Sequence, residues 1–192
     1  KDGAKKTVSL GDKLQDANWA GSNKSKECTL FITEGLSAKS FALAGISVLE
    51  NGQDSFGAFA IKGKFMNVRN ATPSKIASND EIQALQTTLG LIPGTDYGID
   101  DNFKSMRYGK ICVLADQDDD GIHIRGLLAI FFWTRFRSLF IREGFMSSMS
   151  TPLIRINKSI RSEPLKEFYN NAEYQSWVTR DGSKTKGIVS YY

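Results

Sequence analysis

Six consecutive residues near the middle of the chain carry side chains suited to binding a metal ion: Asp116-Gln117-Asp118-Asp119-Asp120-Gly121. They directly follow the apolar run 111–115, which is typical of a strand buried on both faces. Alternate side chains of extended backbone point the same way, so Asp116 and Asp118 should face one space while Gln117 points elsewhere. Carboxylates that lie so close together repel one another unless a cation binds between them. Hard oxygen ligands favour Mg²⁺ or Mn²⁺, and the pattern therefore predicts such a site.

A second acidic residue stands at the end of another strand-like run. Residues 28–33 are largely apolar or β-branched, and Glu34-Gly35 follows them before a helical stretch at 37–48. If this strand and the strand at 111–115 are neighbours, Glu34, Asp116 and Asp118 converge from different chain regions. Each acidic strand end is followed by a glycine, Gly35 or Gly121. Glycine is the residue that a turn requires if the backbone is to bend sharply or to let a phosphate approach closely.

Three other interpretations of the acidic segment compete with a magnesium site. A calcium EF-hand loop requires a bidentate Glu at its twelfth position, which here is Leu127, and an incoming helix rather than a strand. A phosphatase with Asp116 as nucleophile requires small or β-branched residues after the second acid, where this chain has Asp119 and Asp120. A solvated acidic loop remains the structural alternative. The second acidic strand end favours the metal site.

The elements that must position these side chains alternate between strand and helix. The pattern predicts an α/β fold with a mostly parallel sheet, helices on both of its faces, and a strand-rich C-terminal extension. Asn79 and Gly90 are suited to begin and end one helix. The expected domains are a connecting segment (1–26), the α/β domain (27–150) and the extension (151–192). The expected elements are strands at 28–33, 56–61 and 111–115, helices at 37–48, 80–89 and 122–141, extended chain at 145–156 and 165–169, and a short helix at 172–178.

These residues resemble the TOPRIM domain, the metal-binding domain of topoisomerases, bacterial primases and certain nucleases. Longer blocks resemble eukaryotic-type (type IIA) DNA topoisomerase II, and they appear in that family's order. The resemblance covers the chain from about Lys13 to Tyr192. The blocks are Lys13-Leu14-x-Asp16-Ala17-Asn18, Thr33-Glu34-Gly35-x-Ser37-Ala38, Lys62-Gly63-Lys64-x-x-Asn67-Val68-Arg69 and Arg107-Tyr108-Gly109.

The resemblance implies a mechanism and a set of ligands. Glu34, Asp116 and Asp118 would be the catalytic metal-binding residues, with Asp120 supporting them or binding a second ion through water. The resemblance also allows a second role for Glu34, as a general acid in religation. The family usually has Asp at Leu36 and His at Asp119, so the local charge differs here. Such divergence would suit a large DNA virus or a remote eukaryote.

The resemblance also implies what the chain works with. In the family, ATP is bound by a domain that precedes this segment. The nucleophilic tyrosine lies in a winged-helix domain that follows Tyr191-Tyr192, so no tyrosine of this chain takes that role. The expected partners are double-stranded DNA and, in the full-length enzyme, a second copy of the chain. The expected location is the nucleus, or the host cytoplasm for a cytoplasmic DNA virus. The isolated fragment is expected to be inactive.

A basic loop is the next candidate for function. Lys62-Gly63-Lys64, with Arg69, follows a predicted strand, and the glycine would let backbone and ammonium groups approach a phosphate together. By pattern alone a solvated turn is the simpler interpretation, and the resemblance reverses that preference. His123, the sole histidine, is included as a DNA-proximal residue on the same ground.

Composition narrows the class of protein only slightly. The formal net charge of +4 and the pI near 9.0 suit DNA binding and ordinary soluble proteins equally. No apolar stretch is long enough for a membrane span. Two functions of other classes stay open beside the topoisomerase: a stand-alone TOPRIM-type nuclease that uses water as nucleophile, and a binding module with a structural cation.

Overall fold

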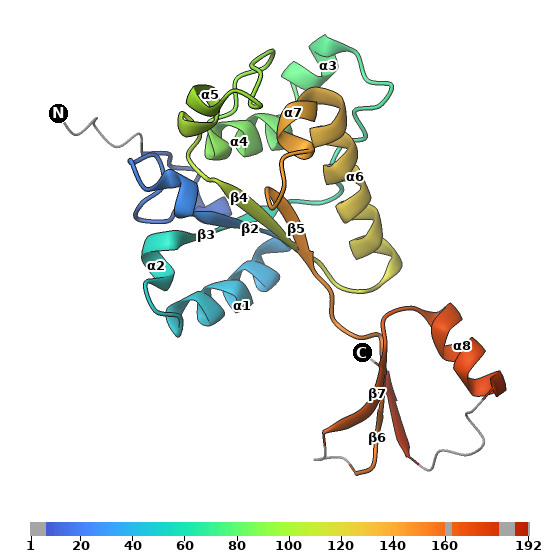
Figure 1. The fold of residues 1–192 in the computed structure, drawn as a ribbon. Coiled ribbons are helices and arrows are strands. Elements are labelled where there is room, and N and C mark those ends of the chain that lie inside the picture. The colour runs from blue at the N-terminus through green and yellow to red at the C-terminus, as the bar shows by residue number, and fades with distance from the viewer. Residues whose placement is uncertain (1–6, 160–162, 181–186, 192) are drawn as a thin grey trace. The chain divides into compact units, whose positions relative to one another are not determined.

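A computed structural model describes residues 7–159, 163–180 and 187–191 (Figure 1). It confirms an α/β protein with a mostly parallel sheet and a strand-rich C-terminal part. The chain divides into two compact units. The first unit comprises residues up to Ala115 together with His123–Met149, and the second comprises Asp116–Ile122 together with residues from Ser150 onward.

The first unit is built on a five-stranded sheet of order β1-β3-β2-β4-β5. Strands β2, β3, β4 and β5 run parallel, and β1 pairs antiparallel with β3. Central strands covered on both faces need side chains that are apolar on both, which explains their nearly continuous apolar sequences. The strands are β1 (Leu14–Gln15), β2 (Thr29–Glu34), β3 (Phe56–Ile61), β4 (Lys110–Leu114) and β5 (Met146–Met149).

Helices cover both faces of this sheet, as expected (Figure 1). On one face α1 (Gly35–Ser47) packs Ala42 and Ile46 against Ala58 of β3, beside the short α2 (Gly52–Ser55). The other face carries the larger core, with β-strand residues such as Ile32 packed among helical side chains. The helices on this second side are α3 (Pro73–Ala77), α4 (Asp80–Leu89), α5 (Asp100–Lys104), α6 (Asp119–Arg135) and α7 (Arg137–Phe140).

The helix expected at 122–141 differs from the observed structure. It begins earlier, at Asp119, and it divides into α6 and α7 at Phe136, whose backbone leaves the helical region (φ −141°, ψ 53°). The break buries the rings of Phe136 and Phe131 together, with centroids 5.6 Å apart. Burial of two large aromatic rings is worth more than one continued turn of helix.

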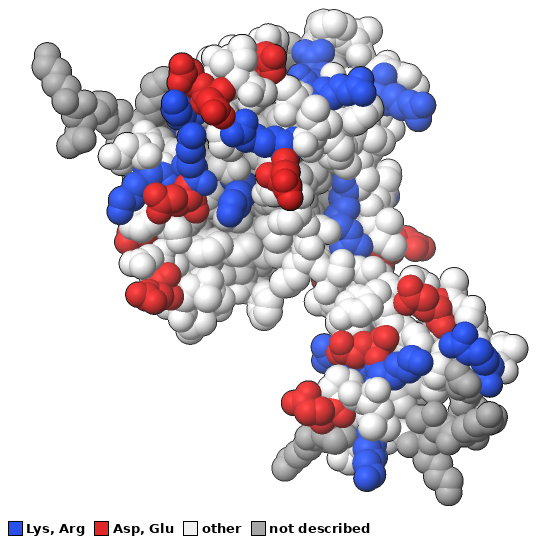
Figure 2. Space-filling view, viewed as in Figure 1, with Lys and Arg blue, Asp and Glu red and all other residues white. Residues whose placement is uncertain are grey.

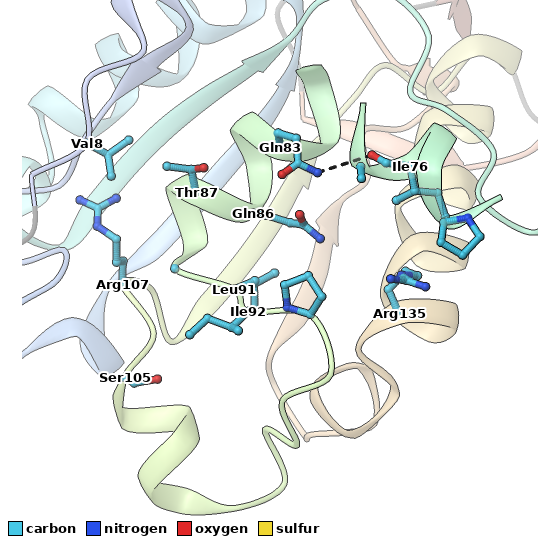
Figure 3. A pocket seen from close by; sticks show the side chains of 14 residues that line it. Val8, Ile76, Gln83, Gln86, Thr87, Leu91, Ile92, Ser105, Arg107 and Arg135 are labelled. Carbon is cyan, nitrogen blue, oxygen red and sulfur yellow. Dashed lines mark hydrogen bonds between the residues drawn. The ribbon is translucent and has the colours of Figure 1, made fainter. Parts of the chain in front are cut away.

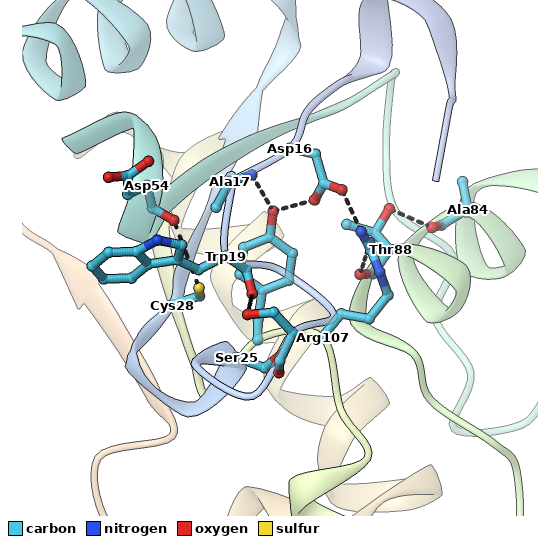
Figure 4. A network of polar contacts seen from close by, with 11 residues as sticks. Asp16, Ala17, Trp19, Ser25, Cys28, Asp54, Ala84, Thr88 and Arg107 are labelled. Carbon is cyan, nitrogen blue, oxygen red and sulfur yellow. Dashed lines mark hydrogen bonds and ion pairs between the residues drawn. The ribbon is translucent and has the colours of Figure 1, made fainter. Parts of the chain in front are cut away.

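The segment expected as a connecting one, 1–26, is part of the first unit where the structure describes it; residues 1–6 lie outside the described residues. Ala17 and Ala20 are fully buried. The carboxylate of Asp16 forms an ion pair with Arg107 and accepts a hydrogen bond from the Tyr108 hydroxyl (Figure 4). Its partners come from distant sequence, so the segment's own composition did not indicate this docking.

The second unit contains a three-stranded antiparallel sheet of order β7-β6-β8 and one helix. Its strands are β6 (Ile154–Asn157), β7 (Pro164–Phe168) and β8 (Ile188–Tyr191), and its helix is α8 (Asn171–Arg180). Phe168 and Trp177 join the helix to the sheet, with ring centroids 5.4 Å apart. Tyr192, half of the terminal tyrosine pair, lies outside the described residues. No helix in the described ranges has the length and apolar content to cross a bilayer.

Candidate functional site

The candidate functional segments follow three neighbouring strands, and all three segments begin at the same edge of the sheet. β2 pairs in parallel with β3, where Glu34 lies opposite Ile61, and with β4, where Thr33 lies opposite Leu114. The condition on which the convergence of Glu34, Asp116 and Asp118 depended, that the two acid-bearing strands are neighbours, is therefore met. Glu34 closes β2, the basic loop follows β3, and the acidic segment follows β4 after one residue. The carboxyl edge of a parallel sheet is where α/β proteins bind ligands.

The glycine beside Glu34 has the conformation that its place requires. Gly35 has φ +78°, a left-handed backbone conformation that residues other than glycine adopt only with strain. Glu34 is half-buried and has extended backbone (φ −79°, ψ 94°), so the chain turns directly from the last residue of β2 into α1. This sharp turn confirms the role anticipated for Gly35.

The acidic segment bends as it enters α6. A bend forms at Gln117 and Asp118, and the N–H of Gly121 donates to Asp118 Oδ1 at 2.8 Å, as at a helix N-cap. A Cβ on Gly121 would lie 2.0 Å from the carbonyl oxygen of Asp116. Only glycine allows the first turn of the helix to lie this close to the acidic backbone.

Within the second unit, Asp116, Gln117 and Asp118 line one cavity of about 410 Å³ with Thr151, Pro152 and Arg155. The expectation that Asp116 and Asp118 face one space is thus confirmed. The expectation that Gln117 points away is wrong, because the bend replaces the strict alternation of extended chain. Gln117 Nε2 also donates to the carbonyl oxygen of Tyr169 at 3.0 Å, which ties the segment to the second unit.

Arg155 is a residue of this cavity that the sequence did not single out. Its Nε lies 2.8 Å from Glu167 Oε1, and both side chains are about one-third exposed. A guanidinium on the wall of an acidic cavity offsets part of the repulsion between the carboxylates. Its position in an ordinary strand, far from the acids in sequence, gave no signal for this role.

The donors at the predicted metal site are all carboxylate oxygens, which fit Mg²⁺ or Mn²⁺ rather than softer metals. Within the described ranges, no three His, Cys, Asp or Glu side chains are grouped so that they could hold an ion. Asp116, Asp118 and Asp120 are exposed, and one oxygen of Asp118 already accepts from the Gly121 N–H. A preformed three-carboxylate cluster is therefore not what the structure shows, and the ligand set remains a prediction.

The basic loop is held by its apolar residues while its charges face solvent. Lys62, Lys64 and Arg69 are exposed, whereas Phe65 and Val68 are 2% exposed. Gly63 has φ +70°, which glycine adopts without strain.

The carboxylate of Glu81 binds the start of this loop. The backbone N–H of Lys62 donates to one oxygen of Glu81, whose other oxygen pairs with Lys13. Lys13 belongs to the first of the blocks that resemble the family, and the structure gives it a supporting role.

His123 is exposed and lies in the second turn of α6. Phe131, on the same helix, is the residue that contacts Phe65 of the basic loop. On each unit, the face drawn in Figure 2 shows acidic and basic side chains intermingled rather than one continuous basic field. On this face, a nucleic-acid contact would therefore depend on particular residues instead of a general positive charge.

Acidic residues that follow two neighbouring parallel strands of an α/β sheet are the arrangement that the resemblance to the TOPRIM class of domain implies. No protein-family model matches the sequence. Among curated proteins, the chain is 46% identical over 186 residues to the mitochondrial DNA topoisomerase 2 of Dictyostelium discoideum, covering 94% of this chain. It is 43% identical to DNA topoisomerase 2 of Pisum sativum, over 100% of this chain, and 40% identical to that of Acanthamoeba polyphaga mimivirus, over 94%.

A solved structure agrees with these relatives. The chain matches the DNA-binding, cleavage and re-ligation domain of Plasmodium falciparum topoisomerase II with a TM-score of 0.82 and 37% identity, covering 98% of this chain and 25% of that one. Over nearly its whole length the chain is thus homologous to type II DNA topoisomerases, as its sequence blocks indicated. It spans only 13–14% of the length of those three curated relatives.

Proposed function

We propose that this chain is the Mg²⁺-binding TOPRIM segment of an ATP-dependent type II DNA topoisomerase, which cleaves both strands of one duplex, passes another through the break and reseals it. The observation that carries the proposal is the similarity, over 98% of the chain, to a domain described as binding, cleaving and re-ligating DNA. The acids at the carboxyl edge of the sheet support it with suitable chemistry.

In this proposal Glu34, Asp116 and Asp118 bind the ion, and Asp120 supports them. Bound Mg²⁺ supplies Lewis acidity to the scissile phosphate and to the departing 3′ oxygen. Separate carboxylates repel until an ion neutralises them, so the ligand set would be completed on binding. The side chains of Lys62, Lys64 and Arg69, with the Gly63 backbone and His123, would contact DNA phosphates. Glu34, at the end of β2, is also suited to hold a proton for religation.

The assembly and location follow from the same proposal. A second copy of the full-length enzyme would complete the dimer, and ATP would be bound by another domain of that enzyme. The place of action would be the nucleus, or the host cytoplasm if the source is a cytoplasmic DNA virus. Fluorescent tagging of the parent protein in its own cells tests this point, since one relative is named as mitochondrial.

Metal binding to the 192-residue chain is the first test. Calorimetric titration with Mn²⁺ and Mg²⁺ should show weak, saturable binding that Glu34→Gln, Asp116→Asn and Asp118→Asn each reduce by about tenfold or more. Asp101→Asn is the matched control, since this exposed carboxylate lies in α5 and pairs only with Lys104 among the described residues. Unchanged binding in the three site variants would refute the ligand assignment.

A chimera tests the activity itself. Residues 1–192 would replace the matching region of the Dictyostelium enzyme, with which the chain is 46% identical. The chimera should relax supercoiled DNA when Mg²⁺ and ATP are present. Asp116→Asn in the chimera should abolish DNA cleavage while ATP hydrolysis continues. Hydrolysis of DNA by the 192-residue chain alone would instead favour a metal nuclease.

A further inference from the structure

A second cavity, of about 500 Å³, opens in the first unit between α3, α4, the turn that follows α4, and the end of α6 (Figure 3). Its size is that of pockets that hold small organic ligands. None of its lining residues belongs to the acidic segment or to the basic loop. Whatever it binds is therefore recognised separately from the proposed metal and DNA contacts.

The feature that sets this pocket apart is the side chain of Gln86. It is only 5% exposed and lies on the buried face of α4, among apolar neighbours such as Ile82 and Leu89. Its carboxamide forms no hydrogen bond with any described residue, whereas the nearby Gln83 donates to the Ile76 carbonyl at 3.5 Å. Figure 3 shows the Gln86 carboxamide directed toward the side of the pocket where Ile76 and Arg135 lie.

The Gln86 carboxamide gains no hydrogen bond from the described part of the protein and opens only to the pocket, so a molecule in the pocket has to supply its hydrogen bonds. An apolar residue would serve the packing of α4 better at this position. The position of Gln86 is explained if a ligand in the pocket bonds its amide. The amide offers two donor hydrogens and one acceptor oxygen, so it recognises a group that both donates and accepts.

Arg135 supplies a charge to the same pocket. It is half-buried at the end of α6, and its guanidinium has no ion pair or hydrogen bond within the described part of the chain. The pocket's other guanidinium, on Arg107, is occupied by Asp16 and by the carbonyl oxygen of Thr88. Arg135 therefore remains to receive an anion, and its planar fork matches a carboxylate.

The remaining walls are apolar and narrow the class of ligand. Ile76, Leu91 and Ile92 line the pocket together with two prolines. We propose that this pocket binds a small organic acid with a flat apolar body, whose carboxylate pairs with Arg135 and whose amide-like group bonds Gln86. The site lies outside the proposed metal and DNA machinery and does not depend on the topoisomerase assignment.

The test uses three probes of known chemistry on the 192-residue chain. Para-acetamidobenzoate carries both polar groups, benzoate carries only the carboxylate, and acetanilide carries only the amide. Each is titrated to ~10 mM while NMR follows the methyl groups of isoleucine, because affinities of single fragments are weak. Para-acetamidobenzoate should shift Ile76 and Ile92 in a saturable way and bind more tightly than the other two.

Two variants separate the roles of the polar side chains. Gln86→Leu should lower the affinity for para-acetamidobenzoate about fivefold and leave the affinity for benzoate unchanged. Arg135→Gln should lower the affinity for both acids about tenfold and leave the affinity for acetanilide unchanged. Arg137→Gln is the control, since this exposed arginine stacks on Trp133 and does not line the pocket. The melting temperature of Gln86→Leu without ligand should rise, which also shows that the variant folds.

Three results would overturn the proposal. One is the absence of saturable shifts at Ile76 and Ile92 with para-acetamidobenzoate. A second is that Gln86→Leu binds all three probes as the unchanged chain does. A third is that Arg135→Gln binds both acids with undiminished affinity.

Discussion

The ring of Phe65 meets the ring of Phe131 edge to face, with centroids 5.5 Å apart and planes inclined by 79°. Phe65 lies in the basic loop, and Phe131 belongs to α6, the helix that begins in the acidic segment. Both rings are buried. The loop that carries the candidate phosphate-binding charges is therefore fixed to α6 by an apolar contact, and the side chains of Lys62, Lys64 and Arg69 are exposed.

The first prediction concerns this contact. Phe65→Ala should lower the free energy of unfolding by ~3–5 kcal/mol, because it leaves a cavity beside Phe131 in a close-packed core. Urea denaturation measures the change. Phe41→Ala, at a ring that is 74% exposed, should cost ~0.5 kcal/mol or less. Equal losses in the two variants would show that Phe65 does not fix the loop.

The second prediction concerns the charges of the basic loop. Lys62→Gln, Lys64→Gln and Arg69→Gln should each weaken binding to duplex DNA and reduce the slope of log K against log salt by about 1. Fluorescence anisotropy over a range of salt concentrations gives the slope. Lys110→Gln is the matched control, since Lys110 is exposed at the amino end of β4, at the opposite edge of the sheet. A control slope that falls as much would show nonspecific attraction.

The third prediction compares two glycines of α6. Gly121→Ala should destabilise the chain by ~1–3 kcal/mol and weaken metal binding, because the new Cβ meets the Asp116 carbonyl oxygen at 2.0 Å. Gly126→Ala has open space around its Cβ and should stabilise the chain by ~0.5–1 kcal/mol. Thermal unfolding and Mn²⁺ titration of both variants provide the comparison. Tolerance of alanine at Gly121 would mean that the acidic segment is not held against the helix.

The fourth prediction concerns alkaline pH. Burial of Tyr108, and then the nearby Asp16 carboxylate, raise the pKa of its phenol from the ordinary value of 10.0. The folded chain thus holds this proton more tightly than the unfolded chain, so the stabilisation is complete below ~pH 10 and is lost as pH rises further. Urea midpoints should fall above ~pH 10 in the unchanged chain.

Tyr108→Phe removes the titrating group, so the alkaline decline in stability should become shallower. The same change should cost ~1–3 kcal/mol at neutral pH, because Asp16 loses a donor and the Ala17 N–H loses its acceptor. Tyr169→Phe, at a tyrosine that is 42% exposed, is the control. An alkaline decline of the same steepness in Tyr108→Phe would contradict the assignment.

Local signals in the sequence predicted where several helices and strands begin and end. The helix expected at 80–89 is α4, where Asn79 accepts from the Ile82 N–H at 2.9 Å and Gly90 has φ +72°. The strand expected at 56–61 is β3. Caps and unbroken apolar runs act over a few residues, so they can be recognised without knowledge of the fold. The order of the acidic and basic segments after their strands was readable for the same reason.

Only the tertiary structure decided which distant side chains meet. Asp16 belongs to the core because Arg107 and Tyr108 reach it from more than ninety positions away. Gln117 faces the same cavity as its acidic neighbours because the chain bends there, and Arg155 lines that cavity from another strand. The pocket around Gln86 likewise requires α3, α4 and α6 to be packed together. Such contacts depend on how separate elements pack, and no window of sequence contains both partners.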